Sequence, residues 1–208
     1  EAGHGVYDRV LKEMTACDIP WLGGNVMDIS DGSTYFPMFK SFYKAGVKVT
    51  VLGFENANIE AWLPEELYSG MSFLSLVPYV QAFVDYVVSI EKPQVVVVVA
   101  HTGTGDGDGS QLESQGLDLF NSLRGVDVLI GGHDHRAYAA TKQGFAYMDC
   151  GSLAGLGGDK DNAIGTLSPV DSGSGSILED VDGFDIVDVD HLESVLHCES
   201  VDNVERRG

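Results

Sequence analysis

Three histidines carry the chemistry that this sequence best supports. His101 follows a run of five valines, and His133 and His135 flank Asp134 directly after a second apolar run that ends in two glycines. Neutral imidazole is a common ligand of zinc, manganese and iron ions, and three imidazoles suffice for one ion. The alternative is a polar surface turn after a buried strand. The third histidine, at the end of the other apolar run, favours the metal site.

The segments that carry these histidines are predicted to be parallel neighbours. The valine run at 95–99 shows no alternation, which predicts a central strand buried on both faces. A short helix is expected at 114–123 and another strand at 126–132. Strand, helix, strand in this order places the two strands side by side or nearly so. Ligands of such sheets bind outside the carboxyl ends of the strands, so the histidines should converge there.

The segments before the valine run predict a mixed α/β arrangement. Residues 19–26 read as a short buried strand that ends in Gly-Gly-Asn, and 35–54 as two strands joined at a turn at 44–46. Ser75 is expected to cap a helix that runs to Ile90. The segment at 56–73 lacks a clean hydrophobic period and is expected to be a loop with a short helical turn.

The two ends of the chain differ from its centre. Apolar residues at helical spacing predict a helix at 6–14. Beyond Tyr138 the pattern changes to short strands, at 144–150, 165–170 and 184–190, between Gly, Ser and Asp turns. The expected division is an α/β domain at 1–170 and an acidic, β-rich or frayed tail at 171–208.

Composition excludes some classes of partner. The chain has 32 Asp and Glu against 12 Lys and Arg, a net charge of −20, so it should repel the backbone of nucleic acid polymers. A small anionic substrate stays open, because metal ions invert the local field. The sequence contains no apolar run long enough to span a bilayer. The three cysteines form no C-x-x-C pattern and are expected to be buried free thiols.

Several motifs, taken in order, resemble those of a known family. "GVDVLIGGHDH" is similar to the G-H-x-H motif of calcineurin-like metallophosphoesterases, and "VVVVVAHTG" to the strand-plus-histidine motif before it. "IPWLGGNVMD" and "GVKVTVLGF" resemble segments of the bacterial 5′-nucleotidase and 2′,3′-cyclic-nucleotide 2′-phosphodiesterase branch. The likeness extends from about Glu1 to Leu153.

This resemblance implies a fold, an activity and a set of ligands. The fold would be α/β, part of a four-layer α-β-β-α sandwich with a β-rich C-terminal tail. The cofactors would be two divalent ions, zinc, manganese or iron, with His101 and His133 on one ion and His135 on the other. The substrate would be a small phosphorylated compound, a nucleotide first of all. The resemblance also implies a periplasmic or secreted location.

The sequence also departs from the family pattern. The family begins with a D-x-H strand end, a G-D motif whose Asp bridges the metals, and a G-N-H-[DE] motif, and none of these is found in its place. In "GGN" at 23–25, Val26 follows where histidine is needed. We therefore expect an incomplete catalytic domain at 1–170 that is inactive alone, and we assign no catalytic residue. We also expect the chain to self-associate or to require the missing N-terminal segment in trans. The alternative is a non-catalytic relic or partner-binding module that binds one ion at most.

Three weaker candidates are interpreted as structural. His4 lies at an expected helix start. Asp106 and Asp108 suggest calcium, but Gln111 and Leu117 occupy positions where an EF-hand needs Gly and Glu, so a solvated loop is expected. "AGLGGDKDNAIG" is rich in glycine but lacks the G-K-[ST] and G-x-G-x-x-G patterns of phosphate loops.

Overall fold

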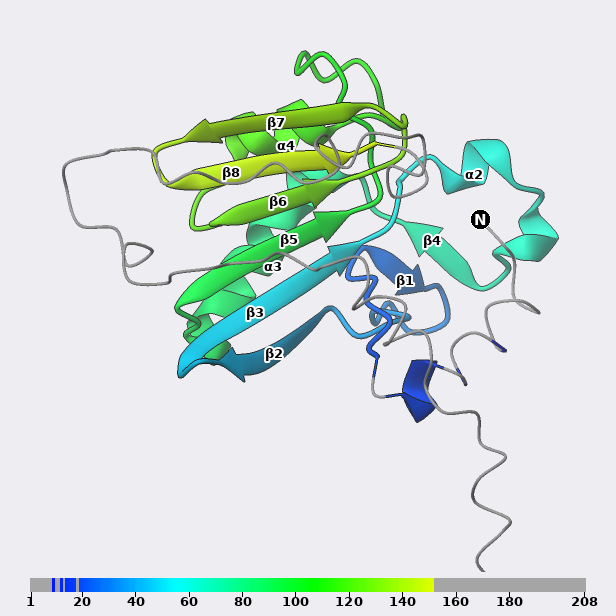
Figure 1. Cartoon of the computed structure of the whole chain (residues 1–208). Helices are drawn as coiled ribbons and strands as arrows, with labels where there is room; N and C mark the ends of the chain where they lie inside the picture. The colour runs from blue at the N-terminus through cyan, green and yellow to red at the C-terminus, as the bar shows by residue number, and fades with distance from the viewer. Residues whose placement is uncertain (1–8, 10–11, 13, 18, 152–208) are drawn as a thin grey trace, which may run out of the picture. The chain divides into compact units, whose positions relative to one another are not determined.

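The computed structural model of the chain describes residues 9, 12, 14–17 and 19–151, all within one compact unit, Glu1–Gly165. None of the helices in this part of the chain has both the length and the hydrophobicity needed to span a bilayer. Figure 1 shows its elements. They are β1 (Val26–Asp28), β2 (Phe39–Lys44), β3 (Val47–Phe54), α2 (Ile59–Trp62), the 3-10 turn η1 (Glu65–Leu67), β4 (Met71–Phe73), α3 (Leu76–Glu91), β5 (Val95–Ala100), α4 (Gly116–Ser122), β6 (Val128–Gly131), β7 (Ala137–Lys142) and β8 (Phe145–Cys150).

A six-stranded mixed sheet organises this unit, in the order β2-β3-β5-β6-β8-β7. Strands β3, β5, β6 and β8 are parallel to one another, while β2 and β7 close the two edges as antiparallel partners of β3 and β8. The prediction that β5 and β6 are parallel neighbours is confirmed. β1 and β4 pair separately in a small two-stranded sheet. The α/β class is therefore confirmed in the described part, and the four-layer arrangement remains a prediction.

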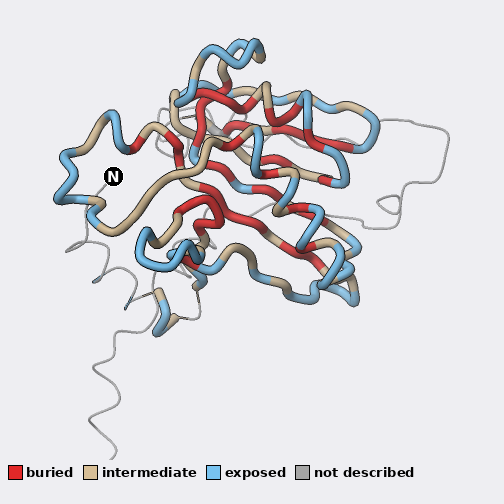
Figure 2. The backbone as a smooth tube through the Cα atoms, turned by 180° about the vertical axis from the view of Figure 1, so that it is seen from behind, coloured by how far each residue is buried: buried red, intermediate tan, exposed pale blue. Residues whose placement is uncertain are grey.

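The core lies between the sheet and two helices on one of its faces, α3 and α4 (Figure 1). α3 begins after Ser75, as predicted, although the Ser75 side chain makes no capping hydrogen bond. The buried face of α3 packs against buried residues of the strands, shown as red tube in Figure 2. The residues fully buried on α3 are Leu76, Val80, Val84 and Val87. Spacing of three and four residues places them on one side of the helix.

Strand β5 differs from the prediction in its burial. Val96 and Val98 are buried toward the helices, but Val99 on the other face is 38% exposed. Burial on both faces is therefore wrong: only the helix side of the valine run is fully covered in the described structure. The strand also has β3 and β6 as partners on either side, so the valine run forms no sheet edge.

The hairpin β2–β3 is confirmed. Ala45 and Gly46 connect the strands with φ angles of 49° and 84°, a left-handed pair that suits the twist of antiparallel strands. The short buried strand predicted at 19–26 is wrong, because pairing begins only at Val26 in β1. Strands β4 and β7 were not predicted. Both are short or half exposed, so hydrophobic periodicity gives little signal for them.

The expectation of free thiols is wrong for Cys17, which is disulfide-bonded. Separation along the sequence does not limit which cysteines meet in a fold. Much of the predicted helix at 6–14, together with His4, lies outside the described residues. So do the strands predicted at 165–170 and 184–190, the glycine-rich segment at 154–165 and the whole tail at 171–208.

Candidate functional site

His101 and His133 lie side by side at the carboxyl end of the sheet. His101 directly follows β5, and its backbone N–H donates to Phe54 O at 2.9 Å. His133 follows β6 after one intervening glycine, Gly132. The two imidazole rings meet edge to face with centroids 5.0 Å apart, and His133 Nδ1 lies 3.3 Å from His101 Nε2.

The parallel register of β5 and β6 explains this proximity. Val97 pairs with Val128 and Val99 with Ile130, so both strands end at nearly the same level. Beyond the strands, Gly132 N–H donates to Thr102 O at 3.1 Å, which continues the pairing into the two loops. The histidines thus emerge from adjacent strand ends, as the sequence predicted.

The two glycines before His133 have different roles. A Cβ on Gly131 would lie 3.1 Å from the Tyr147 ring and 3.3 Å from Thr102 O, closer than most real contacts allow. A Cβ on Gly132 would meet nothing within 4 Å. Neither glycine has a positive φ. Close packing therefore accounts for Gly131, whereas the structure gives no steric reason for Gly132.

Trp62 covers one face of His133. The indole of Trp62, the last residue of α2, stacks on the His133 imidazole with centroids 4.9 Å apart and an interplanar angle of 17°. Such contact restrains the ring plane of the histidine. Sequence reasoning missed Trp62, because it lies far from His133 in the sequence, in a segment without a clear period.

His135 is not part of the contact between His101 and His133. It is exposed and has a φ of 59°, a left-handed conformation that is uncommon for a residue with a bulky side chain. Within the described parts of the chain, no group of three or more His, Cys, Asp or Glu side chains is placed to hold a metal ion. The structure therefore brings together two of the three predicted ligands.

Asp134 connects the loops that carry the histidines. Its Oδ2 accepts a hydrogen bond from Thr104 N–H at 2.9 Å, in the loop after His101. Its Oδ1 accepts one from Arg136 N–H at 3.2 Å, across His135. The side chain also packs against the backbone of Gly103, where an added Cβ would lie 3.0 Å from Asp134 Cβ.

A buried carboxyl group lies close to this site. Asp149, near the end of β8, is 3% exposed; its Oδ1 accepts from Gly151 N–H at 3.2 Å, and its Oδ2 has no hydrogen-bond partner. Burial raises the pKa of Asp149, and the nearby Asp134 raises it further, whereas His135 and His101 act in the opposite direction. Asp149 pairs with Gly131 in the sheet, two residues before His133, so its carboxyl group lies near the histidine loops. Nothing in the local sequence pattern distinguished it from other strand residues.

The neighbouring Tyr147 is buried beneath the same loops. Burial raises the pKa of its phenol well above its usual value. The hydroxyl packs so closely on Gly116 that a side chain there would collide with it. Although Thr104 lies near this hydroxyl, neither it nor the Thr104 hydroxyl makes a well-formed hydrogen bond. The layer beneath the histidines is thus polar, tightly packed and incompletely paired.

Two polar candidates are occupied by structural bonds. The Asn25 amide is 1% exposed and bonds the backbone of Glu55 and Leu74, so it is not available as a ligand. Asp106 and Asp108 are exposed and accept hydrogen bonds from Gln111 and Ser110 inside their own loop. The bonds of Asp106 and Asp108 agree with the interpretation of their segment as a solvated loop.

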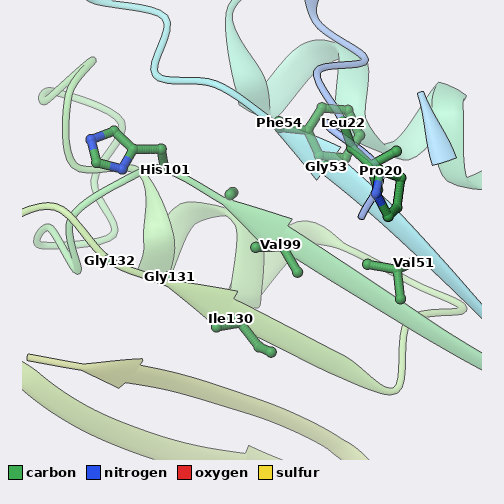
Figure 3. A pocket seen from close by; sticks show the side chains of 11 residues that line it. Pro20, Leu22, Val51, Gly53, Phe54, Val99, His101, Ile130, Gly131 and Gly132 are labelled. Atoms are coloured by element: carbon green, nitrogen blue, oxygen red, sulfur yellow. The ribbon is translucent and has the colours of Figure 1, made fainter. Parts of the chain in front are cut away.

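An apolar groove of about 370 Å³ leads along the sheet to His101 (Figure 3). Side chains of β3, β5 and β6 form its floor, on the face opposite the helices. The lining residues are Pro20, Leu22, Val51, Gly53, Phe54, Val99, Ala100, His101, Ile130, Gly131 and Gly132.

The histidine pair fits a metal ion. Two nitrogens bound to one tetrahedral zinc ion at about 2.0–2.1 Å are separated by about 3.3–3.4 Å. The separation of His133 Nδ1 from His101 Nε2 is 3.3 Å. This distance matches one edge of such a tetrahedron, and it is equally that of a hydrogen bond between the two imidazoles, with the donor set by the tautomer. The remaining ligands must be supplied by other groups.

Comparisons with known proteins agree with the resemblance seen in the sequence. No family model matches the chain. It is 22% identical over 129 residues to a 5′-nucleotidase of Vibrio vulnificus, a match that covers 61% of this chain and 23% of that protein.

Solved structures share the fold. A Staphylococcus aureus protein assigned as a 5′-nucleotidase superposes with a TM-score of 0.61 at 22% identity, over 72% of this chain and 30% of that one. The calcineurin-like phosphoesterase YfkN of Bacillus subtilis gives 0.57 at 22% identity, over 65% and 47%. This chain spans less than half the length of each protein it matches here. The fold is that of the calcineurin-like phosphoesterases, and the sequence is similar to the 5′-nucleotidase branch.

Proposed function

We propose that this chain carries part of a metal-dependent phosphoester hydrolase site, acting on nucleotides or related phosphomonoesters and cyclic phosphodiesters. The observation that carries the proposal is the approach of His133 Nδ1 to His101 Nε2 at 3.3 Å, at the ligand-binding end of a parallel sheet. Relatives with the same fold and similar sequence include 5′-nucleotidases and a calcineurin-like phosphoesterase.

In this proposal His101 and His133 hold one divalent ion, and His135 a second. When bound, such ions polarise a phosphoryl oxygen and lower the pKa of a coordinated water. His101 and His133 bind through neutral imidazole nitrogens, and Trp62 fixes the plane of the His133 ring. A bridging carboxylate and a leaving-group acid remain to be supplied from outside the described residues.

The substrate class comes from the relatives rather than from contacts in this chain. Nucleotide preference rests on the likeness to 5′-nucleotidases. A periplasmic or secreted location follows from the same resemblance. The disulfide at Cys17 supports it, because disulfides persist mainly in oxidising compartments.

The test is metal and phosphate binding by the full chain after treatment with EDTA. Calorimetric titration with Zn²⁺ or Mn²⁺ should show binding that weakens at least about tenfold in His133→Ala and His101→Ala, since even indirect supports of a metal ligand contribute that much. Tyr43→Ala, which removes a ring 71% exposed on β2, is the matched control and should bind normally. Inorganic phosphate should bind only when metal is present. Absence of metal binding, or unchanged binding in His133→Ala, would contradict the proposal.

The second candidate is a non-catalytic module with at most one bound ion. It is favoured by the observation that the described residues place no three metal-binding side chains together. Metal stoichiometry separates the two functions. One ion per chain with no bound phosphate supports the module, and two ions with metal-dependent phosphate binding support the hydrolase.

A further inference from the structure

We infer that Asp134 is the positioning residue of the histidine site: it holds the loop after His101 against the turn that carries His133 and His135. Asp134 lies between the two histidines in the sequence, and it is half-buried between the two loops. Both of its carboxylate oxygens are engaged by backbone amides, one from each loop.

The first hydrogen bond joins segments that are distant in sequence. Thr104 N–H donates to Asp134 Oδ2 at 2.9 Å across a separation of 30 residues. Thr104 is buried, so its amide would lose a partner without gaining water if the carboxylate were removed. This bond and the Gly132–Thr102 backbone bond hold the loops at the level where the two imidazoles meet.

The second hydrogen bond stabilises the strained backbone of His135. Arg136 N–H donates to Asp134 Oδ1 at 3.2 Å and closes a side-chain turn around His135. Aspartate is well suited to such turns, because its short side chain reaches a backbone amide two residues ahead. The φ of 59° at His135 is otherwise unfavourable for this residue type. The bond thus selects the direction in which His135 leaves the chain.

Packing makes the arrangement specific to a short side chain. A Cβ on Gly103 would lie 3.0 Å from Asp134 Cβ and 3.1 Å from Asp134 Cγ, so the carboxylate rests directly on the glycine backbone. A longer acid could not place its oxygens on both amides without moving one loop. Asp134 itself faces backbone amides and acts through the histidines beside it.

The test compares Asp134→Ala with Asp134→Asn in the full chain. The ion to be used, Zn²⁺, rests on the proposed function. Zn²⁺ affinity should fall about 10–100-fold in Asp134→Ala, the usual cost of removing a group that orients a metal ligand. Asn retains one oxygen acceptor and should recover at least half of that loss on a logarithmic scale. Asp108→Ala removes a similar side-chain turn, with Ser110, from the adjacent exposed loop and should leave affinity unchanged.

Amide hydrogen exchange provides a measurement that needs no metal. In Asp134→Ala, the amides of Thr104 and Arg136 should exchange at least about tenfold faster, while amides of the β5 core keep their wild-type rates. Wild-type exchange at both amides would overturn the inference, as would wild-type Zn²⁺ affinity in Asp134→Ala. If the wild-type chain binds no Zn²⁺, the proposed function fails, and the exchange rates alone decide whether Asp134 holds the loops.

Discussion

Replacing Asp149 with asparagine is expected to stabilise the protein at neutral pH. The carboxyl group is 3% exposed, and only one of its oxygens has a hydrogen-bond partner, the Gly151 amide. The introduced asparagine would retain an oxygen for that amide and carry no charge. Its NH₂ group has nearly the volume of the carboxylate oxygen that it replaces, so the packing of β8 should be preserved.

The sign of the effect follows from the raised pKa of Asp149, whose usual value is 3.8. The folded state holds the proton more tightly than the unfolded state. Tighter proton binding by the folded state adds to the free energy of unfolding. The added stability is fully present below the usual pKa and is lost as the pH rises through the raised pKa of the folded state. A buried polar group without a partner costs about 1–3 kcal/mol. The NH₂ group of the introduced asparagine is left without a partner too, so the gain comes from removing the buried charge. We expect Asp149→Asn to gain at most about that amount at pH 8, and the gain to diminish toward acid pH.

The assay is urea unfolding of the EDTA-treated chain at several values from about pH 4, near the usual pKa of the carboxyl group, to about pH 8. For a protein of this size, about 1 kcal/mol corresponds to about 2–4 °C in thermal midpoint, so heat denaturation gives a second measurement. Asp108→Asn is the control, because Asp108 is exposed and Ser110 lowers its pKa rather than raising it. A less stable Asp149→Asn at pH 8, or a difference that does not change with pH, would refute the reasoning.

Three further outcomes are expected. Gly131→Ala should cost about 1–3 kcal/mol, since its Cβ would press on Tyr147 and Thr102 O, whereas Gly132→Ala should be nearly neutral; equal melting temperatures would contradict this. The purified chain with Mn²⁺ should hydrolyse p-nitrophenyl phosphate near background, because no general acid is assembled in the described site; robust turnover that His135→Ala abolishes would show the site to be complete. The chain should self-associate in sedimentation experiments, because the groove beside Val99 exposes apolar surface on the sheet face; a monodisperse monomer would count against this.

The parts of the fold that follow local rules could be predicted from the sequence. A β-α-β unit is predicted by the valine run, the short helix after it and the apolar run that ends at Gly131. The strands of such a unit are parallel and joined by a right-handed crossover. The meeting of His101 with His133 follows from that register alone. The hairpin at Ala45 and Gly46 was equally visible, because left-handed turn residues stand between two strand patterns.

The remaining features depend on contacts between segments that no local pattern connects. Strand β7 pairs only as the antiparallel partner of β8, and α2 brings Trp62 onto His133 from a distant part of the sequence. The full burial expected for Val99 was wrong because an unbroken valine run does not reveal whether a second layer covers the sheet. The hydrogen bonds of Asp134 were also invisible, since a short polar residue between two histidines reads as part of a turn.

Charge sets the last constraint on how such a site could work. The chain carries a net charge of −20, and Asp134 and Asp149 place carboxyl groups close to the histidines. A phosphate approaching this surface is repelled at long range and meets carboxyl groups beside the histidines at the site itself. Bound cations would reverse the local field. A site built from Lys and Arg side chains would attract the anion without metal ions. Metal ions are thus the means we propose by which an acidic chain accepts a phosphoester, and metal binding is therefore tested before activity.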